Sequence, residues 1–231
     1  MITPRDAARL VVSDLWSRRG VETVLRGVDL ELHAGEVVLL EGANGSGKTT
    51  LLETIAGLIR PLSGAIRLDG QRIDGQRADR VVARGVALVH QERHLFATLT
   101  VAQHLALAGF ATRRGTPAHS LATSLETFGL EPFEATPAGL LSGGEQRLLA
   151  IARGLRARPL VALMDEPLAA LAAGLRERIL RHLRALADGG TAVMVVEHDA
   201  ARVRPYADRS LVLRDGVLAG EWIAGGGVHH H

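Results

Sequence analysis

The sequence predicts an α/β fold in which a mixed sheet carries a phosphate-binding loop. Three observations support this prediction. An apolar run at 37–40 leads into a glycine-rich loop and then a helical pattern, and a second apolar run at 160–164 ends in two adjacent carboxylates. Between them, residues 99–139 show helical periodicity and no strand pattern. The chain of 231 residues is long enough for one large α/β core or two modest subdomains.

The first ninety residues read mainly as strands. We expect strands at 10–15, 28–32 and 37–40, with turns at Gly20 and at Ala34-Gly35, so the amino-terminal part forms an antiparallel β subdomain. A helix is predicted over 49–58, because Pro61 prevents its continuation. Shorter strands are predicted at 65–68 and 86–89.

The rest of the chain inserts helices and then returns to the α/β pattern. Helices are predicted around 100–107 and 120–126. A central strand follows at 160–164, a helix at 175–187, a strand at 192–196 and a hairpin at 211–218 that turns at Asp-Gly. We therefore expect one domain over 8–224, with the α/β core in 1–90 and 157–224 and a helical subdomain in 91–156. Residues 225–231 read as a flexible tail or an engineered remnant.

The loop after the strand at 37–40 has the pattern G-x-x-x-x-G-K-T. Its glycines let backbone N–H groups turn toward an anion at the positive end of the next helix. Lys48 is the only lysine of the chain and Asn44 the only asparagine, and both lie in this loop. Lys48 would reach the β- and γ-phosphates, and the Thr49 hydroxyl would ligate Mg²⁺. The predicted ligands are Gly42, Ala43, Asn44, Gly45, Ser46, Gly47, Lys48, Thr49 and Thr50.

Two carboxylates, Asp165 and Glu166, follow the strand at 160–164. The carboxyl ends of parallel strands are where open α/β sheets place ligands. Asp165 would hold Mg²⁺ through its water shell, and Glu166 would orient or deprotonate an attacking water. A helix cap could explain the pair by itself, but its place about 110 residues after the phosphate loop favours the catalytic interpretation.

A second possible anion site lies at 142–145. Ser142 can cap the helix that follows and Glu145 can complete a capping box. Gly143 and Gly144 leave backbone N–H groups exposed at the positive helix end, where they can bind an anion. The first phosphate loop does not need this second site. Two phosphate sites in one chain suggest that two copies pair.

Together these motifs resemble those of ABC transporter ATPases, and the resemblance covers nearly the whole chain. Residues 42–49, 141–146 and 163–166 are similar to the Walker A, signature and Walker B motifs, Gln91 to the Q-loop glutamine, and His198 to the switch histidine. The resemblance implies the ABC ATPase fold. It also implies ATP and Mg²⁺ as cofactors, Gln91 as a sensor of Mg²⁺ and water, and His198 on the γ-phosphate.

The same resemblance implies partners. Two cassettes, identical or different, would bind head to tail, each ATP lying between the phosphate loop of one and the signature of the other. The segment 92–98 and the helices after it would dock on transmembrane permease subunits. A periplasmic or extracellular solute-binding protein could complete the system. The chain would be cytoplasmic, held at the inner face of the membrane by the permease.

Within that family, the segments 84–101 and 142–151 resemble the branched-chain amino acid importers. Two features depart from the family pattern. Ala169 and Ala172 stand where a serine and an aspartate are usual, which puts communication between the two sites in question. Arg19 stands where an aromatic residue usually stacks on adenine, so either the Arg19 guanidinium or the nearby Trp16 would supply that platform.

Composition excludes several other classes. The net charge is only +2 and the arginines are interspersed with acids, which indicates a solvated surface and no nucleic-acid partner. Zero cysteines exclude disulfides and thiolate metal sites, and neither a signal peptide nor a run of about 18 apolar residues is visible. Two alternatives remain: a soluble ABC ATPase acting on ribosomes or DNA, and a P-loop kinase or GTPase, which would leave 141–146 unexplained.

Overall fold

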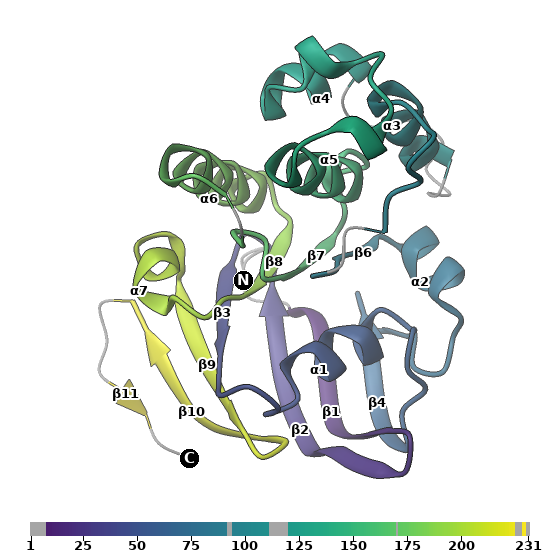
Figure 1. Ribbon diagram of the computed structural model, residues 1–231. Helices are drawn as coiled ribbons and strands as arrows, with labels where there is room; N and C mark the ends of the chain where they lie inside the picture. Colours follow the sequence, from purple (N-terminus) through teal and green to yellow (C-terminus); the bar gives the residue numbers. More distant parts are fainter. Residues whose placement is uncertain (1–7, 92–93, 111–119, 170, 225–227, 230–231) are drawn as a thin grey trace, which may run out of the picture.

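A computed structural model describes residues 8–91, 94–110, 120–169, 171–224 and 228–229 of the chain. It contains two sheets and a group of helices (Figure 1). The predicted α/β class is confirmed, with an antiparallel sheet formed by the amino-terminal strands and a mixed sheet behind it.

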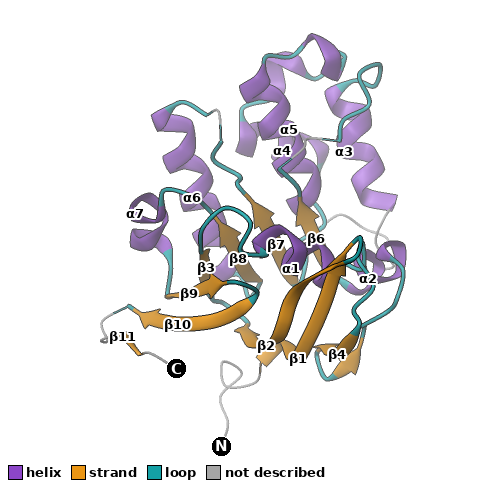
Figure 2. Cartoon of the chain, turned by 60° about the horizontal axis from the view of Figure 1, so that its bottom comes forward, coloured by secondary structure: helices purple, strands orange, loops and turns teal. Residues whose placement is uncertain are grey.

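The antiparallel sheet has the order β2-β1-β4-β5. Its strands are β1 (Ala8–Arg19), β2 (Glu22–His33), β4 (Ser63–Leu68) and β5 (Gln71–Arg72). The first two are longer than the predicted 10–15 and 28–32, because they pair with each other up to the turn at Gly20. Figure 2 shows this sheet on the side of the molecule opposite α3 to α5.

The mixed sheet has the order β11-β10-β9-β3-β8-β7-β6. The five strands from β9 to β6 are parallel: β9 (Arg209–Arg214), β3 (Val37–Glu41), β8 (Ala192–Val196), β7 (Val161–Asp165) and β6 (Val86–Val89). The antiparallel strands β10 (Val217–Ile223) and β11 (Val228–His229) extend one edge. The sequence does not predict β11, since it falls within the proposed tail.

Alternating side chains of the central strands separate two cores. Val37 and Leu39 face the core shared with α5 and α6, whereas Val38 and Leu40 face the core shared with α1 and the antiparallel sheet. Because both faces of these strands are buried, they read as continuous apolar runs in the sequence. The carboxyl ends of β3, β6, β7 and β8 therefore open onto one edge of the sheet, where the predicted motifs lie.

The helices are α1 (Lys48–Ile55), α2 (Ala78–Arg84), α3 (Val101–Phe110), α4 (Leu121–Phe128), α5 (Gly143–Leu155), α6 (Ala173–Asp188) and α7 (Ala200–Val203). Short 3₁₀ turns occur at Glu131–Phe133, Ala138–Leu140 and Arg204–Tyr206. One predicted boundary needs correction, since helix α1 ends at Ile55 and not at 58, because Gly57 adopts φ +76°. Strand β5 and the helices α2 and α7 were also not predicted from the sequence.

A bulge in β1 sets the direction of the side chains near the site. Leu10 and Val12 are buried, but Asp14 adopts φ +45° and shifts the alternation, so that Leu15 and Ser17 are the next buried residues. Gly64 of β4 makes room for the bulge, since a Cβ there would lie 2.3 Å from the Asp14 carbonyl oxygen. Among the described residues, no helix is both long enough and apolar enough to cross a membrane.

Candidate functional site

The phosphate loop connects β3 to α1 in a left-handed turn that glycine allows. Gly45 and Gly47 have φ +79° and +106°, and Gly47 is the residue before the first turn of α1. The Lys48 ammonium donates to the Gly42 and Ala43 carbonyls at 2.7 and 2.9 Å. Burial lowers the pKa of Lys48, while the nearby Glu166 and Asp165 act in the opposite direction. The loop thus holds one partly desolvated cation at the start of a helix.

Asp165, at the end of β7, faces the loop. The Thr49 hydroxyl donates to its Oδ2 at 3.0 Å, whereas its Oδ1 is buried without a hydrogen-bond partner. Burial raises the pKa of Asp165, and the Thr49 hydrogen bond opposes that rise. A hydroxyl and a carboxylate with a free oxygen form a donor set that fits Mg²⁺, which takes a few protein oxygens and completes its shell with water and phosphate.

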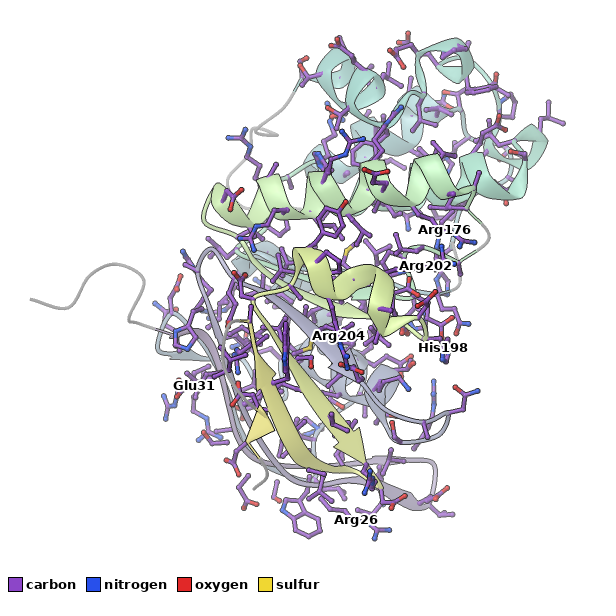
Figure 3. The ribbon with its side chains drawn as sticks, turned by 90° about the vertical axis from the view of Figure 1, so that its left-hand side faces the viewer. Arg26, Glu31, Arg176, His198, Arg202 and Arg204 are labelled. Carbon is purple, nitrogen blue, oxygen red and sulfur yellow. The ribbon has the colours of Figure 1, made fainter. Side chains whose placement is uncertain are left out.

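Glu166 contacts two other predicted residues that are far from it in the sequence. Its Oε2 accepts from Gln91 Nε2 at 3.1 Å, and its Oε1 lies 2.7 Å from Nε2 of His198. The backbone of Glu166 has φ +48° and donates to the Val196 carbonyl, which fixes the carboxylate at the ends of β7 and β8. Figure 3 shows His198 at the edge of the molecule, below Arg176 and Arg202.

The loop and these residues line one cleft of about 540 Å³. Its wall consists of Arg19, Glu22, Val24, Asn44, Gly45, Gly47, Lys48, Thr49, Thr50, Gln91, Glu166, Val196 and His198. Arg19 therefore lies in the cleft. Trp16 does not line it, and its indole N–H donates to Asp14 at 2.8 Å. Of the two predicted base platforms, the geometry favours Arg19.

The predicted signature residues lie apart from this cleft. Ser142 caps α5, and its hydroxyl accepts from the Glu145 N–H at 3.4 Å while the Glu145 carboxylate accepts from the Ser142 N–H at 2.6 Å. The predicted capping box is thus present. Ser142 and Gly143 are exposed, and none of the four residues 142–145 lines the cleft. Within one copy of the chain, the predicted second anion site at 142–145 therefore lies apart from the cleft at the phosphate loop.

Sequence reasoning missed three side chains that organise the site. Arg147, buried on α5, donates to the carbonyls of His90 and Gln91, and also to those of Asp165 and Glu166. Glu53 of α1 and His90 form a hydrogen bond of 2.8 Å. The signal for Arg147 was its spacing of three and four residues from Ala150 and Ile151 on the buried helix face.

Ala169 and Ala172, the first of the two departures from the family pattern, lie between Glu166 and α6 and do not line the cleft. Ala172 precedes α6 with no side-chain cap, and Ala169 N–H donates to the Glu166 carbonyl. Ala170, between them, lies outside the described residues, as do Glu92 and Arg93 of the predicted docking segment. Gly225–Gly227 and the last two histidines of the predicted tail are also outside them.

Comparisons with known proteins identify the family of the chain. The ABC transporter family model matches residues 25–169. A high-affinity branched-chain amino acid transport ATP-binding protein, BraG of Pseudomonas aeruginosa, is 37% identical over 83% of both chains. A sulfate/thiosulfate import ATP-binding protein, CysA 2 of Chromobacterium violaceum, is 39% identical over 90% of this chain and 56% of its own length.

Solved structures match over almost the whole chain. A dimeric ATP-binding cassette in a post-hydrolysis state, bound to ADP and Pi, is 28% identical with a TM-score of 0.83, covering 94% of this chain and 100% of the cassette. A nucleotide-free cassette from an ABC transporter is 26% identical with a TM-score of 0.82, covering 94% and 92%. The chain belongs to the ABC transporter ATP-binding family and is an ATPase.

Proposed function

We propose that this chain hydrolyses ATP as one half of a head-to-tail dimer and powers a separate transmembrane permease of an import system. The observation that carries the proposal is that the cleft at the predicted phosphate loop and the exposed, capped start of α5 lie apart on the same chain. Branched-chain amino acids are the first solutes to test, because BraG is similar over most of both chains. Other relatives are named for the import of sugars and of sulfate, so these solutes are the next to test.

In the proposed reaction the phosphate loop binds the nucleotide first. Lys48 would exchange its two carbonyl partners for β- and γ-phosphate oxygens, which better match its charge. Thr49, Asp165 and Gln91 would hold Mg²⁺, and the unpartnered Asp165 Oδ1 supports this assignment. Bound Mg²⁺ would neutralise charge on the transferred phosphoryl group.

Glu166 is the proposed general base. Its carboxylate accepts hydrogen bonds from groups on both sides, Gln91 and His198, so it is oriented before a nucleotide binds. His198 would turn from Glu166 to the γ-phosphate, and Gln91 would move with Mg²⁺ and the attacking water. Both side chains are exposed at the cleft, which leaves them room for this exchange of partners.

The partner's residues 142–145 are proposed to close the site. Their N–H groups lie at the positive end of α5, a helix of 13 residues, and can stabilise a phosphate that the first loop has already bound. ATP binding would then favour the closed dimer, and hydrolysis would reopen it, which is the movement that the permease uses.

A groove between α2 and the helices α3 and α5 is the proposed docking surface for the permease. It has a volume of about 270 Å³ and is lined by apolar residues that include Val82, Leu88, Phe96 and Leu107. Phe96 is 62% exposed and Leu107 47% exposed, which is unusual for large apolar side chains outside an interface. A short apolar helix of a permease subunit fits a groove of this kind.

Complementation between two inactive variants tests the head-to-tail dimer. Lys48→Ala removes the phosphate loop's cation, and Ser142→Arg blocks the signature. Neither variant alone should hydrolyse ATP, but a mixture forms heterodimers in which the intact loop of one chain faces the intact signature of the other. Steady-state ATPase measured against the mixing ratio should therefore rise and fall, with its maximum near equal amounts. A mixture that remains inactive contradicts the composite site.

Membrane association tests the permease partner. In the source cell, the parent chain should sediment with the membrane fraction. Leu107→Glu should release it, whereas Leu140→Glu, a matched change at an apolar residue that does not line the groove, should not. Both variants should keep their ATPase activity in solution. Equal sedimentation of all three proteins would contradict the docking surface.

A further inference from the structure

Glu53 is a buried carboxylate for which the proposed nucleotide chemistry has no task. It lies on α1, the helix that follows the phosphate loop, and only 7% of the residue is exposed. A carboxylate in such a place loses its hydration and needs cations or hydrogen-bond donors around it. Two side chains from other elements supply them: Arg19 at the end of β1 and His90 just after β6.

The contacts differ for the two partners. His90 Nε2 lies 2.8 Å from Glu53 Oε1, so this imidazole nitrogen donates to the carboxylate. Arg19 Nη2 donates to the same oxygen at 3.3 Å and lies 3.2 Å from Oε2. Oε2 is buried and has no hydrogen bond of good geometry, so its contact with the guanidinium is electrostatic.

In this arrangement Glu53 holds one nitrogen of the Arg19 guanidinium, and the Arg19 side chain still lines the cleft. The Arg19 side chain is 60% exposed and lines the cleft beside Glu22 and Val24. Ser17, two residues earlier on the same strand, lies on the same side of β1 and contacts Thr54 of α1 at 3.0 Å. An arginine without such an anchor would have to lose much of its rotamer freedom in order to stack.

We propose that Glu53 is a positioning residue that holds Arg19 as the platform for the nucleobase. This inference rests on the proposed ATP-binding function and extends it, because it assigns the orientation of the base platform to a buried residue of the phosphate-loop helix. His90 completes the anchor, and the residue after it, Gln91, lines the cleft together with Arg19.

The test compares two ligands, MgATP and inorganic Mg-tripolyphosphate, by isothermal titration with the full chain. The dissociation constant of Mg-tripolyphosphate divided by that of MgATP isolates the contribution of the base. Glu53→Gln keeps the shape of the side chain but removes its charge, and should reduce this ratio about 2- to 10-fold without changing tripolyphosphate affinity. Arg19→Ala should give the same reduction. Adding E53Q to R19A should then change nothing further.

Rescue separates positioning from a structural role. In Arg19→Tyr an aromatic ring stacks without a charged anchor, so E53Q should have no effect on the ratio in that background. Glu31→Gln, which removes an exposed carboxylate of β2 outside the cleft wall, serves as the matched control and should leave the ratio unchanged. If E53Q does not fold, Glu53→Asp withdraws the carboxylate by one methylene and should lower the ratio in the same selective way.

The proposal is overturned if the Glu53 variant leaves the ratio unchanged, weakens both ligands equally, or acts additively with R19A. Failure of the proposed function looks different, since the parent chain would then bind neither ligand. A parent that binds both ligands equally would refute the base platform while leaving phosphate binding in place.

Discussion

Arg147 of the signature helix donates a hydrogen bond of 2.8 Å to the backbone carbonyl of Gln91, 56 residues earlier in the chain. The same Nη1 donates to the His90 carbonyl at 2.9 Å, and Nη2 reaches the carbonyls of Asp165 and Glu166. One planar guanidinium thus joins α5, the end of β6 and the end of β7. If α5 moved toward a partner chain, Arg147 would therefore displace the backbone at Gln91 and Glu166.

Arg147→Lys should test that connection. A lysine has a single nitrogen and cannot span carbonyls on two strands, so we expect the free energy of unfolding in urea to fall by about 2 kcal/mol. Turnover should fall while MgATP affinity is retained. Arg181→Lys, on the exposed face of α6, is the matched control. Equal urea midpoints for R147K and the parent would contradict the structural role.

Lys48→Ala should lower MgATP affinity by at least about 100-fold, because it removes the buried cation that faces the phosphates. Lys48→Arg should fail as well, since the guanidinium fork cannot occupy the space of the ammonium between the Gly42 and Ala43 carbonyls. Arg18→Ala, which removes an exposed positive charge from β1, is the control. Titration with a fluorescent ATP analogue measures all three, and unchanged affinity in K48A would refute the phosphate-loop assignment.

Glu166→Gln should bind MgATP but turn it over at least about 100-fold more slowly, since it removes the general base and keeps the side-chain shape. The variant should elute as a dimer in size-exclusion chromatography with MgATP and as a monomer with ADP. Glu31→Gln, which removes an exposed carboxylate of β2 outside the cleft, should hydrolyse ATP at nearly the parent rate. Hydrolysis by E166Q at the parent rate would exclude Glu166 as the base.

Asp165→Asn should stabilise the chain without nucleotide on the order of 1 kcal/mol at pH 8. Burial raises the pKa of Asp165 in the folded state, so the folded chain binds this proton more tightly than the unfolded chain does. Above the folded-state pKa, the ionised Asp165 carboxylate therefore lowers the free energy of unfolding. This loss disappears as the pH falls through the folded-state pKa toward the ordinary value of 3.8. Urea unfolding of both proteins between pH 4 and pH 8 measures the difference.

The same Asp165 variant separates stability from function. Because Asn cannot replace the carboxylate as a Mg²⁺ ligand of equal strength, the rise in melting temperature that MgATP gives the parent should be lost in D165N. ATP with EDTA should affect both proteins alike. A melting temperature that still rises with MgATP in D165N would contradict the metal assignment.

Gly64→Ala should destabilise the chain by about 3 kcal/mol, because the new Cβ would lie 2.3 Å from the Asp14 carbonyl oxygen inside the bulge. Gly70→Ala provides the matched control. Gly70 also has positive φ, at +77°, but a Cβ there meets nothing within 4 Å, so only the backbone strain of about 1 kcal/mol remains. Urea midpoints measure both variants, and equal losses would show that the bulge tolerates a side chain.

The sequence by itself determined the features of this protein that are built from neighbouring residues. These are the phosphate loop, the apolar strands of the mixed sheet and the capping box at Ser142. Each depends on residues only a few positions apart, so local patterning predicted it. The helix ends were less predictable. A single positive φ at Gly57 ended α1 before Pro61 could do so.

Only the tertiary structure shows that Arg19 lines the cleft and Trp16 does not. Strand alternation allowed either side chain to face the base, until the bulge at Asp14, fitted against Gly64, turned Ser17 and Arg19 toward α1 and left Trp16 on Asp14. The anchor of Arg19 was equally hidden from the sequence. Glu53 and His90 meet because β6 ends beside α1, and a sequence separation of 37 residues carries no local signal of that contact.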